Sequence, residues 1–334
     1  MLRGTGLVAS ALGAFLIVLA LFTRFYIADQ AIKFPLNEHT VTTLLARDVS
    51  YFNPSELQEL TGVTMTDTST TEGDVASGST STAVWNNFSY IFDQTDGIAY
   101  NYSLQRLAFD RRSGELVNCC GANVNTTRVR FSGLGYVWPL GAQKTTYQIF
   151  DTTLMATHPV SYAGTATVYG LATYKYVESV APTRIGTEQL PGSLVGMLDQ
   201  ATVSLGEYYA GTTTDYVDPV SGGPVKVRSS QHLYLVDSSG KQVLNLLNGT
   251  FATVPASVAA AVHTAKSYDA KVFVVTVVLP ATVGLAGVIV LIIGVIMARI
   301  RPESDYEDLT PADYGGGAPG YQGGDDFRGG QVPV

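Results

Sequence analysis

Two uncharged apolar segments, one near each end of this 334-residue chain, constrain its fold more than any other feature. Residues 5–23 carry no charge, and nineteen helical residues extend about 28 Å, close to the hydrocarbon thickness of a bilayer. Residues 272–298 are also uncharged, and this segment is long enough to cross a bilayer with some tilt. We therefore predict two transmembrane helices, at residues 5–23 and 271–298.

The first segment has two interpretations, because Arg3 before it also suits a secretory signal peptide. A signal peptide ends in a cleavage site of small residues. Arg24, Phe25 and Tyr26 stand at that place instead. The pattern favours an uncleaved anchor, with cleavage as the alternative.

Basic residues predict the orientation of both segments. Arg299 and Arg301 follow the second segment directly, whereas Lys271 is the basic residue at its other end. The positive-inside rule then places both termini in the cytoplasm, since Arg3 precedes the first segment; Arg24 on the outer side is the exception. We expect a double-pass plasma-membrane protein with a short cytoplasmic N-terminus at residues 1–4. Residues 24–270 form its extracytoplasmic domain, and residues 299–334 form a disordered, glycine-rich acidic cytoplasmic tail.

The extracytoplasmic segment has the composition of β-structure. Alternating patterns rich in Val, Thr and Tyr predict strands at residues 127–131, 166–169, 173–177 and 225–228. An Asp-x-x-Ser-Gly element recurs at residues 110–114 and 218–222, with a shorter form at 237–240. Asp caps its own turn and Gly supplies positive φ, so we interpret these elements as hairpin turns rather than calcium loops.

Helices are expected at few places outside the two anchors. Residues 53–62 begin with a capping pattern, residues 191–205 carry Leu at helical spacing, and residues 255–266 form an Ala- and Val-rich run toward the second anchor. Residues 66–83 are rich in Ser and Thr and predict a loop. The predicted fold class is α+β: a β-rich domain, with an antiparallel or barrel-like sheet, flanked by two transmembrane helices.

Signals for enzymatic chemistry are weak. The four histidines lack partners at metal-ligand spacing, and the chain contains no nucleophile elbow and no phosphate-binding loop. A net charge of −8 argues against nucleic acid as a partner. We expect no enzyme activity, no metal and no cofactor. The sequence leaves open whether any of the scattered carboxylates converge in a glycosidase-like pair.

Cys119 and Cys120 are the two cysteines of the chain, and they are adjacent. In an oxidising compartment they have only each other within one chain. Ring closure as a vicinal disulfide is one interpretation. Two free thiols and cross-linking to another chain are the alternatives.

Four stretches of the extracytoplasmic segment resemble an actinobacterial envelope family that carries the label "PorA family". They are AFDRRSGE (108–115), KTTYQIFD (144–151), GLATYKY (170–176) and YVDPVSG (216–222). The resemblance implies a two-anchor envelope protein that moves or senses glycolipids such as trehalose mycolates or lipomannans. It also implies a part in polar growth, beside a mycolate-exporting transporter. The two-anchor plan is similar to that of class B scavenger receptors, whose outer domains pass lipid through a tunnel.

Three hypotheses for function follow. The first is a non-enzymatic, membrane-tethered module whose outer domain binds lipid or glycolipid and assists envelope lipid transport beside an exporter. The second is a scaffold that recruits envelope partners without a ligand, and the third is an enzyme on envelope glycans. We do not expect a porin, because a membrane barrel needs a lipid-facing apolar phase on each strand. Here charged residues fall on both phases, as in residues 110–112.

Overall fold

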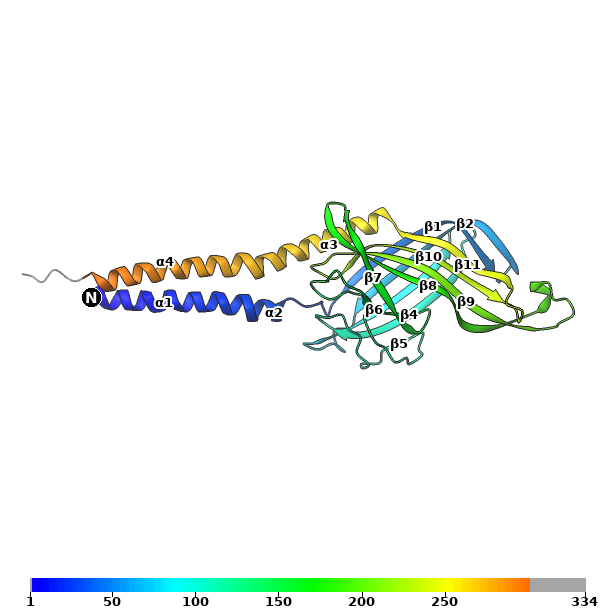
Figure 1. The fold of residues 1–334 in the computed structure, drawn as a ribbon, viewed down its shortest axis with the longest axis horizontal. Coiled ribbons are helices and arrows are strands. Elements are labelled where there is room, and N and C mark those ends of the chain that lie inside the picture. Colours follow the sequence, from blue (N-terminus) through cyan, green and yellow to red (C-terminus); the bar gives the residue numbers. More distant parts are fainter. Residues whose placement is uncertain (1, 301–334) are drawn as a thin grey trace, which may run out of the picture.

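The computed structural model describes residues 2–300 and consists of a long helical pair joined to a β-rich head (Figure 1). The prediction for the tail at residues 299–334 therefore lies outside the described residues, apart from its first two positions. The head contains strands from His39 to Thr253, and both ends of this region lead into helices. This arrangement confirms the predicted class, a β-rich fold with two flanking apolar helices.

Two nearly continuous helical rods leave the head side by side (Figure 1). The first rod consists of α1 (Leu2–Phe22), the π-helical turn η1 (Thr23–Ile27) and α2 (Ala28–Ala31); the second consists of α3 (Pro255–Phe273), the π-helical turn η3 (Val274–Val278) and α4 (Leu279–Arg299). The stretches Gly4–Ile27 and Pro255–Arg299 are long and apolar enough to cross a membrane. The predicted helix at residues 255–266 is confirmed, and it continues into the second anchor as expected.

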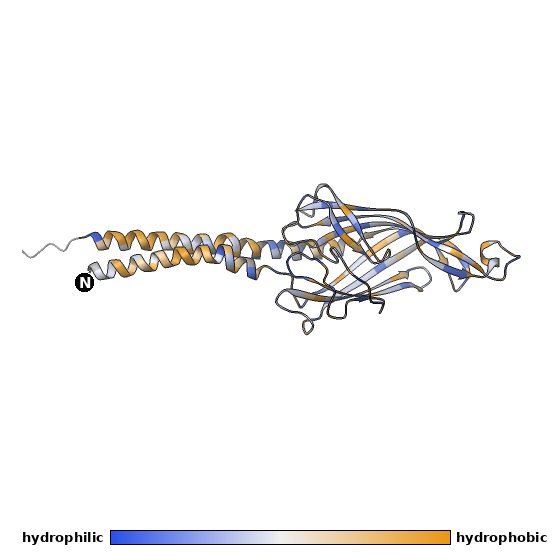
Figure 2. Cartoon of the chain, turned by 60° about the horizontal axis from the view of Figure 1, so that its bottom comes forward, coloured by the Kyte–Doolittle hydropathy of each residue, from blue (hydrophilic) through white to orange (hydrophobic). Residues whose placement is uncertain are grey.

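Glycines bring the backbones of α1 and α4 into direct contact. A Cβ atom added to Gly13 would overlap the backbone of Leu291, and one added to Gly294 would overlap the backbone of Ser10. Close approach through small residues is a common way for helices to associate in lipid. Large apolar side chains such as Leu7 and Leu285 are exposed. Both rods are hydrophobic over most of their length (Figure 2).

The described residues of the head form one 11-stranded sheet in the order β5-β4-β3-β2-β1-β11-β10-β9-β8-β7-β6. Every neighbouring pair is antiparallel, and the first and last strands, β1 and β11, pair at its centre. The strands are β1 (His39–Asn53), β2 (Gln58–Gly73), β3 (Thr82–Asp93), β4 (Ala99–Asp110), β5 (Asn123–Val124), β6 (Tyr147–Asp151), β7 (Ala156–Val168), β8 (Leu171–Leu190), β9 (Val203–Val217), β10 (Pro224–Val236) and β11 (Gln242–Thr253), with the short 3-10 helix η2 (Gly192–Val195) between β8 and β9.

The sheet curls, and a loop connects its two sides. Across the curl, the hydroxyl of Tyr100 on β4 donates to the carbonyl of Leu246 on β11, although three strands separate them in the sheet. Between the edges, the irregular chain at Leu134 forms bridges to both sides: to Glu115 after β4 and to Ile149 on β6. The result is a barrel-like sheet whose closure depends on a loop rather than on a strand pair.

The enclosed face carries two apolar layers with polar residues between them. Trp85 on β3, Phe109 on β4 and Phe150 on β6 belong to one apolar cluster, whereas Met65 on β2 and Phe251 on β11 belong to another. Between these clusters, polar side chains on the same face bond to one another. Three such hydrogen bonds are Asn87 to Thr71, Gln105 to Thr152, and Thr213 with Ser229.

Four sequence-based predictions of local structure are wrong. Residues 53–62 form the turn between β1 and β2 instead of a helix. The side chain of Asn53 accepts hydrogen bonds from the backbone N–H groups of Ser55 and Glu56, as a helix cap does. Asn53 nevertheless pairs with Gln58 across the two strands, so the chain reverses direction here. Residues 191–205 form a loop with the single turn η2 and the start of β9, not a long helix. Residues 66–73 belong to β2, and residues 127–131 are irregular apart from a bridge at Thr127.

Candidate functional site

Two of the three recurrent Asp turns lie at the end of the head that faces the helices. Asp110 accepts hydrogen bonds from the backbone N–H groups of Arg112 and Ser113, both at 2.9 Å. Asp218 accepts from the N–H of Ser221 at 2.9 Å and connects β9 to β10. The structure confirms the interpretation of these elements as turns capped by their own aspartates.

A third segment, residues 138–142, connects these two turns. The N–H of Trp138 donates to the carbonyl of Gly222 at 2.8 Å, and the N–H of Leu140 donates to that of Arg112 at 3.0 Å. Ala142 donates to the carbonyl of Pro219 at 2.8 Å. Because these are backbone hydrogen bonds, the three pieces form one connected end surface of the head.

A pocket of about 730 Å³ lies between this surface and the two helical rods. Its volume is typical of a site for a small-molecule or lipid ligand. We refer to it as the junction pocket. It is lined by residues of the first rod and the residue that follows it (Arg24, Phe25, Ala28 and Ile32), of the head (Arg112, Leu140, Gly141, Ala142, Gln143, Tyr174, Pro219 and Val220) and of the second rod (Val272 and Thr276).

Both rods change their hydrogen-bond pattern at the level of the junction pocket. Arg24 and Phe25 belong to the π-helical turn η1, and Thr276 belongs to the π-helical turn η3. Single π-helical turns inside α-helices are rare and frequent at functional sites. Here they occur in both helices where the close helical pair meets the head.

The junction pocket combines apolar walls with positive charge. Ile32, Leu140 and Val272 supply aliphatic surface, while Arg24 and Arg112 supply two guanidinium groups. The guanidinium of Arg24 lies 5.6 Å from the centre of the Phe25 ring, a cation–π contact. Among the side chains that the structure describes, none of those lining the pocket is acidic. This chemistry suits an amphiphile with a polar or anionic end.

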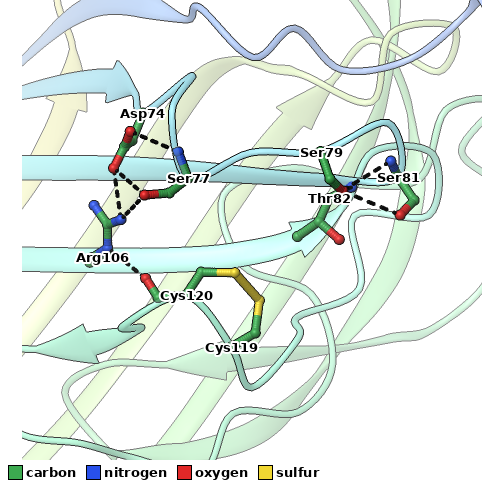
Figure 3. The surroundings of a disulfide bond; sticks show 8 residues. All are labelled: Asp74, Ser77, Ser79, Ser81, Thr82, Arg106, Cys119 and Cys120. Atoms are coloured by element: carbon green, nitrogen blue, oxygen red, sulfur yellow. Dashed lines mark hydrogen bonds and ion pairs between the residues drawn. A yellow bond between two sulfur atoms is a disulfide. The ribbon is translucent and has the colours of Figure 1, made fainter.

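The two cysteines lie elsewhere, on the irregular chain after β4. The structure joins Cys119 to Cys120 by a disulfide, and Cys120 has a φ of +58° (Figure 3). Arg106 on β4 donates from Nε to the carbonyl of Cys120 at 2.9 Å and from a terminal nitrogen to Asp74 at 2.7 Å. The hydrogen bond from Arg106 lowers the pKa of Asp74 to about 2. Arg106 therefore connects the cysteine turn to the loop that precedes β3.

A second group of titratable residues lies on the enclosed face of the sheet. Glu178 on β8 is buried with 9% of its surface exposed, and its carboxylate lies 3.8 Å from Nδ1 of His158 on β7. Burial, followed by the charges of Asp151 and Asp215, raises the pKa of Glu178 to about 7. Burial also raises the pKa of Asp215 to about 7. Among residues 2–300, no group of three or more His, Cys, Asp or Glu side chains is arranged to hold a metal ion.

Sequence reasoning did not identify the junction pocket. Two signals for it were visible: the Asp turns at residues 110–114 and 218–222, and Arg24 at the end of the first apolar segment. Nothing in the sequence indicated that these three elements lie together, because the sheet topology that joins them is a tertiary property.

The fold and the pocket define a class of protein: a curled antiparallel head on a pair of membrane-length helices, with a pocket where they join. Comparison with family models then gives the family. The family model described as Porin PorA matches residues 5–296, and the chain belongs to the PorA family. None of the curated proteins matches it. The likeness to class B scavenger receptors stays an analogy of topology.

Proposed function

We propose that this protein is a double-pass membrane protein of the cell envelope that binds a lipid in the junction pocket without chemically altering it. The observation that carries the proposal is the position of this pocket. It lies between two membrane-length helices and the head, so a lipid could reach it without leaving the membrane surface.

The lining of the pocket supports this proposal. Phe25 and Val272 lie on the rods themselves, and they continue the apolar surface of the helices into the pocket. Arg24 follows the apolar stretch of α1, at the level where basic and aromatic residues meet lipid headgroups. The lipid would thus keep its acyl chains along the helices and place its polar end under the head.

The remaining parts of the proposal concern orientation and partners. With both termini in the cytoplasm, the head is extracytoplasmic and works beside an envelope lipid exporter.

The family label names a porin. Along β10, however, the positions that alternate with Val227 and Ser229 are Lys226, Arg228 and Ser230. These three polar side chains lie on one face of β10 and suit contact with water, whereas the wall of a membrane barrel needs apolar side chains toward lipid. For this reason we favour lipid binding over a pore.

The test is native mass spectrometry of the full-length protein, purified in mild detergent from a mycolate-producing host, combined with lipid extraction. We expect one co-purified amphiphile per chain. A lipid-free mass in repeated preparations would contradict lipid binding and favour the scaffold hypothesis.

A pair of matched variants locates the site. Thr276 and Thr282 both lie on the second rod and both donate a hydroxyl to the carbonyl four residues earlier, but only Thr276 lines the pocket. Thr276→Trp should obstruct part of the pocket and reduce the amount of bound lipid, while Thr282→Trp should retain it. Equal retention in both variants would show that the lipid binds elsewhere.

A further inference from the structure

The outer face of the sheet carries a group of exposed apolar side chains on strands β1 to β4. Side chains on this face alternate with Thr71 and Asn87, which bond to each other on the enclosed face. Two rows of directly paired residues cross the four strands here: Val41, Thr70, Phe88 and Leu104 in one row, and Thr43, Thr68, Tyr90 and Tyr102 in the next. We refer to these eight residues as the outer patch.

The outer patch is aromatic and uncharged. Its five larger side chains are each between 38% and 68% exposed, and they are Val41, Phe88, Tyr90, Tyr102 and Leu104. The ring centres of Phe88 and Tyr90 lie 5.9 Å apart, with an angle of 32° between the ring planes. Threonine hydroxyls lie in the same two rows, so ring surfaces and hydroxyl groups are side by side.

Charge first appears at the margin of the outer patch. The adjoining row contains Glu72 and Arg106. Arg106 is paired with Asp74 at 2.7 Å, and Glu72 lies 3.5 Å from His39. The patch itself therefore suits an uncharged ligand.

The size of the outer patch limits what can cover it. The five exposed side chains present roughly 400–500 Å², given that a large side chain covers about 150–250 Å². A patch of this size on a monomer is often functional. A stable protein interface, however, buries about 800 Å² on each partner. A narrow ligand fits the patch better than a second copy of the chain or another folded domain.

The height of the outer patch separates it from the bilayer. The N–H of Thr43 donates to Oγ of Ser257 at 3.1 Å, so this row lies level with the start of α3. From Ser257 the helix continues for fourteen residues to Lys271, where the predicted membrane segment begins, a rise of about 21 Å along its axis. The headgroup layer extends only about 5–8 Å beyond the hydrocarbon. Lipid is thus not what covers this face.

We propose that the outer patch binds a neutral polysaccharide chain, whose sugar rings stack on Phe88, Tyr90 and Tyr102. One face of a pyranose ring is made of C–H groups, and these are attracted to the electron-rich face of an aromatic ring. The hydroxyls around the rim of the sugar can bond to the threonine and tyrosine hydroxyls. An extended peptide would add to the edge of a sheet, whereas these residues lie on its face. The proposal is independent of lipid binding in the junction pocket.

The experiment is native gel electrophoresis of the full chain in mild detergent, with a polysaccharide cast into the gel. The neutral probes are dextran, mannan and laminarin, and the anionic probe is polygalacturonate. We expect at least one neutral probe to slow the protein in proportion to its concentration, and the anionic probe to have no specific effect.

Variants assign the binding to the patch. Tyr102→Ala should weaken it about three- to tenfold, the range expected for one aromatic contact, whereas Tyr102→Phe keeps the ring and should retain most of it. Tyr169→Ala is the matched control, because Tyr169 is also an exposed tyrosine but lies outside the patch, between β7 and β8. Fluorescence of Trp85 and Trp138, both buried in the head, verifies that each variant is folded.

Four outcomes overturn the proposal. One is unchanged mobility in all three neutral probes, and another is a response to polygalacturonate alone. The third is equal retardation of Tyr102→Ala and the unmodified protein, which would place the sugar elsewhere. The fourth is a dimer of the unmodified protein that Tyr102→Ala dissociates in sedimentation analysis, which would assign the patch to a second copy of the chain.

Discussion

Glu178 offers a direct test of the electrostatics inside the head. The substitution Glu178→Gln keeps the size and polarity of the side chain but removes its ability to ionise. Glu178 is almost fully buried beside His158, and burial is the main cause of its raised pKa. The variant should therefore change how stability depends on pH, with little effect on packing.

The sign follows from the direction of the shift. In the unfolded chain Glu178 ionises near its ordinary value of 4.5, whereas in the folded head its pKa is about 7. The neutral carboxyl thus favours the folded state below about pH 4.5, and this contribution is lost as the pH rises through about 7. A shift of this size corresponds to about 3 kcal/mol at most, since one pKa unit is worth about 1.4 kcal/mol.

The assay is urea unfolding of the full chain in detergent micelles between pH 5 and pH 8, followed by the fluorescence of Trp85 and Trp138. At pH 5 the variant should match the unmodified protein within about 1 kcal/mol. At pH 8 it should be more stable by about 2–3 kcal/mol. Asp215 also has a raised pKa and remains in both proteins, and its charge acts on Glu178, so the difference between their curves reports the ionisation of Glu178 together with its interaction with Asp215.

Glu115→Gln is the matched control, because Glu115 is exposed and its removal should leave the curve unchanged. The reasoning is refuted if the Glu178→Gln curve runs parallel to that of the unmodified protein from pH 5 to pH 8. A parallel curve would mean that the carboxylate of Glu178 is as well stabilised in the folded head as in water.

Three further predictions concern the backbone and the cysteines. Gly13→Ala should push the paired helices apart by on the order of 1 Å, since carbon atoms in contact are about 3.5–4.0 Å apart. Distances between spin labels placed on the two helices measure this separation. Gly284→Ala is the control, because its added Cβ would have ordinary contacts and should leave the distances unchanged. Gly222→Ala should lower the free energy of unfolding of the head by about 3 kcal/mol or more, because the added Cβ overlaps the carbonyl of Trp138. Gly240 has a similar positive φ but open space around it, so Gly240→Ala should lower that free energy by only about 1–2 kcal/mol. Urea unfolding measures both. The cysteine pair should resist alkylation until a reductant is added, and intact mass should then increase by two adducts; alkylation without reductant would contradict the disulfide.

The sequence predicted the parts of the fold that depend on local composition. The apolar helices follow from hydropathy, and the turns at Asp110 and Asp218 follow from residue types that cap and reverse the chain. The strand at residues 66–73 was missed because its enclosed face lies in the polar layer, so that Ser69 and Thr71 face inward while Thr70 and Glu72 face outward. With polar residues on both faces, the alternation that identifies a half-buried strand disappears.

The junction pocket depends on contacts between distant parts of the chain and could not be predicted in this way. Its lining comes from the first rod, from loops between strands, and from the second rod. Arg24 and Thr276 line one pocket because the two rods pack against each other and because β1 and β11, which follow and precede the rods, are neighbours in the sheet. Local pattern says nothing about that pairing.

The central pairing of β1 with β11 also determines when the head can be completed during synthesis. Neighbouring strands elsewhere are hairpins that can form in the order in which they emerge, but Leu44 pairs with Thr253 across nearly the whole head. Thr253 is followed within two residues by α3, the beginning of the second rod. A chain interrupted before β11 would present two unpaired strand edges, a signal for aggregation or proteolysis. Completion of the sheet at its centre and synthesis of the second helix are thus nearly simultaneous, and a chain that lacks β11 leaves the edges of β1 and β10 unpaired.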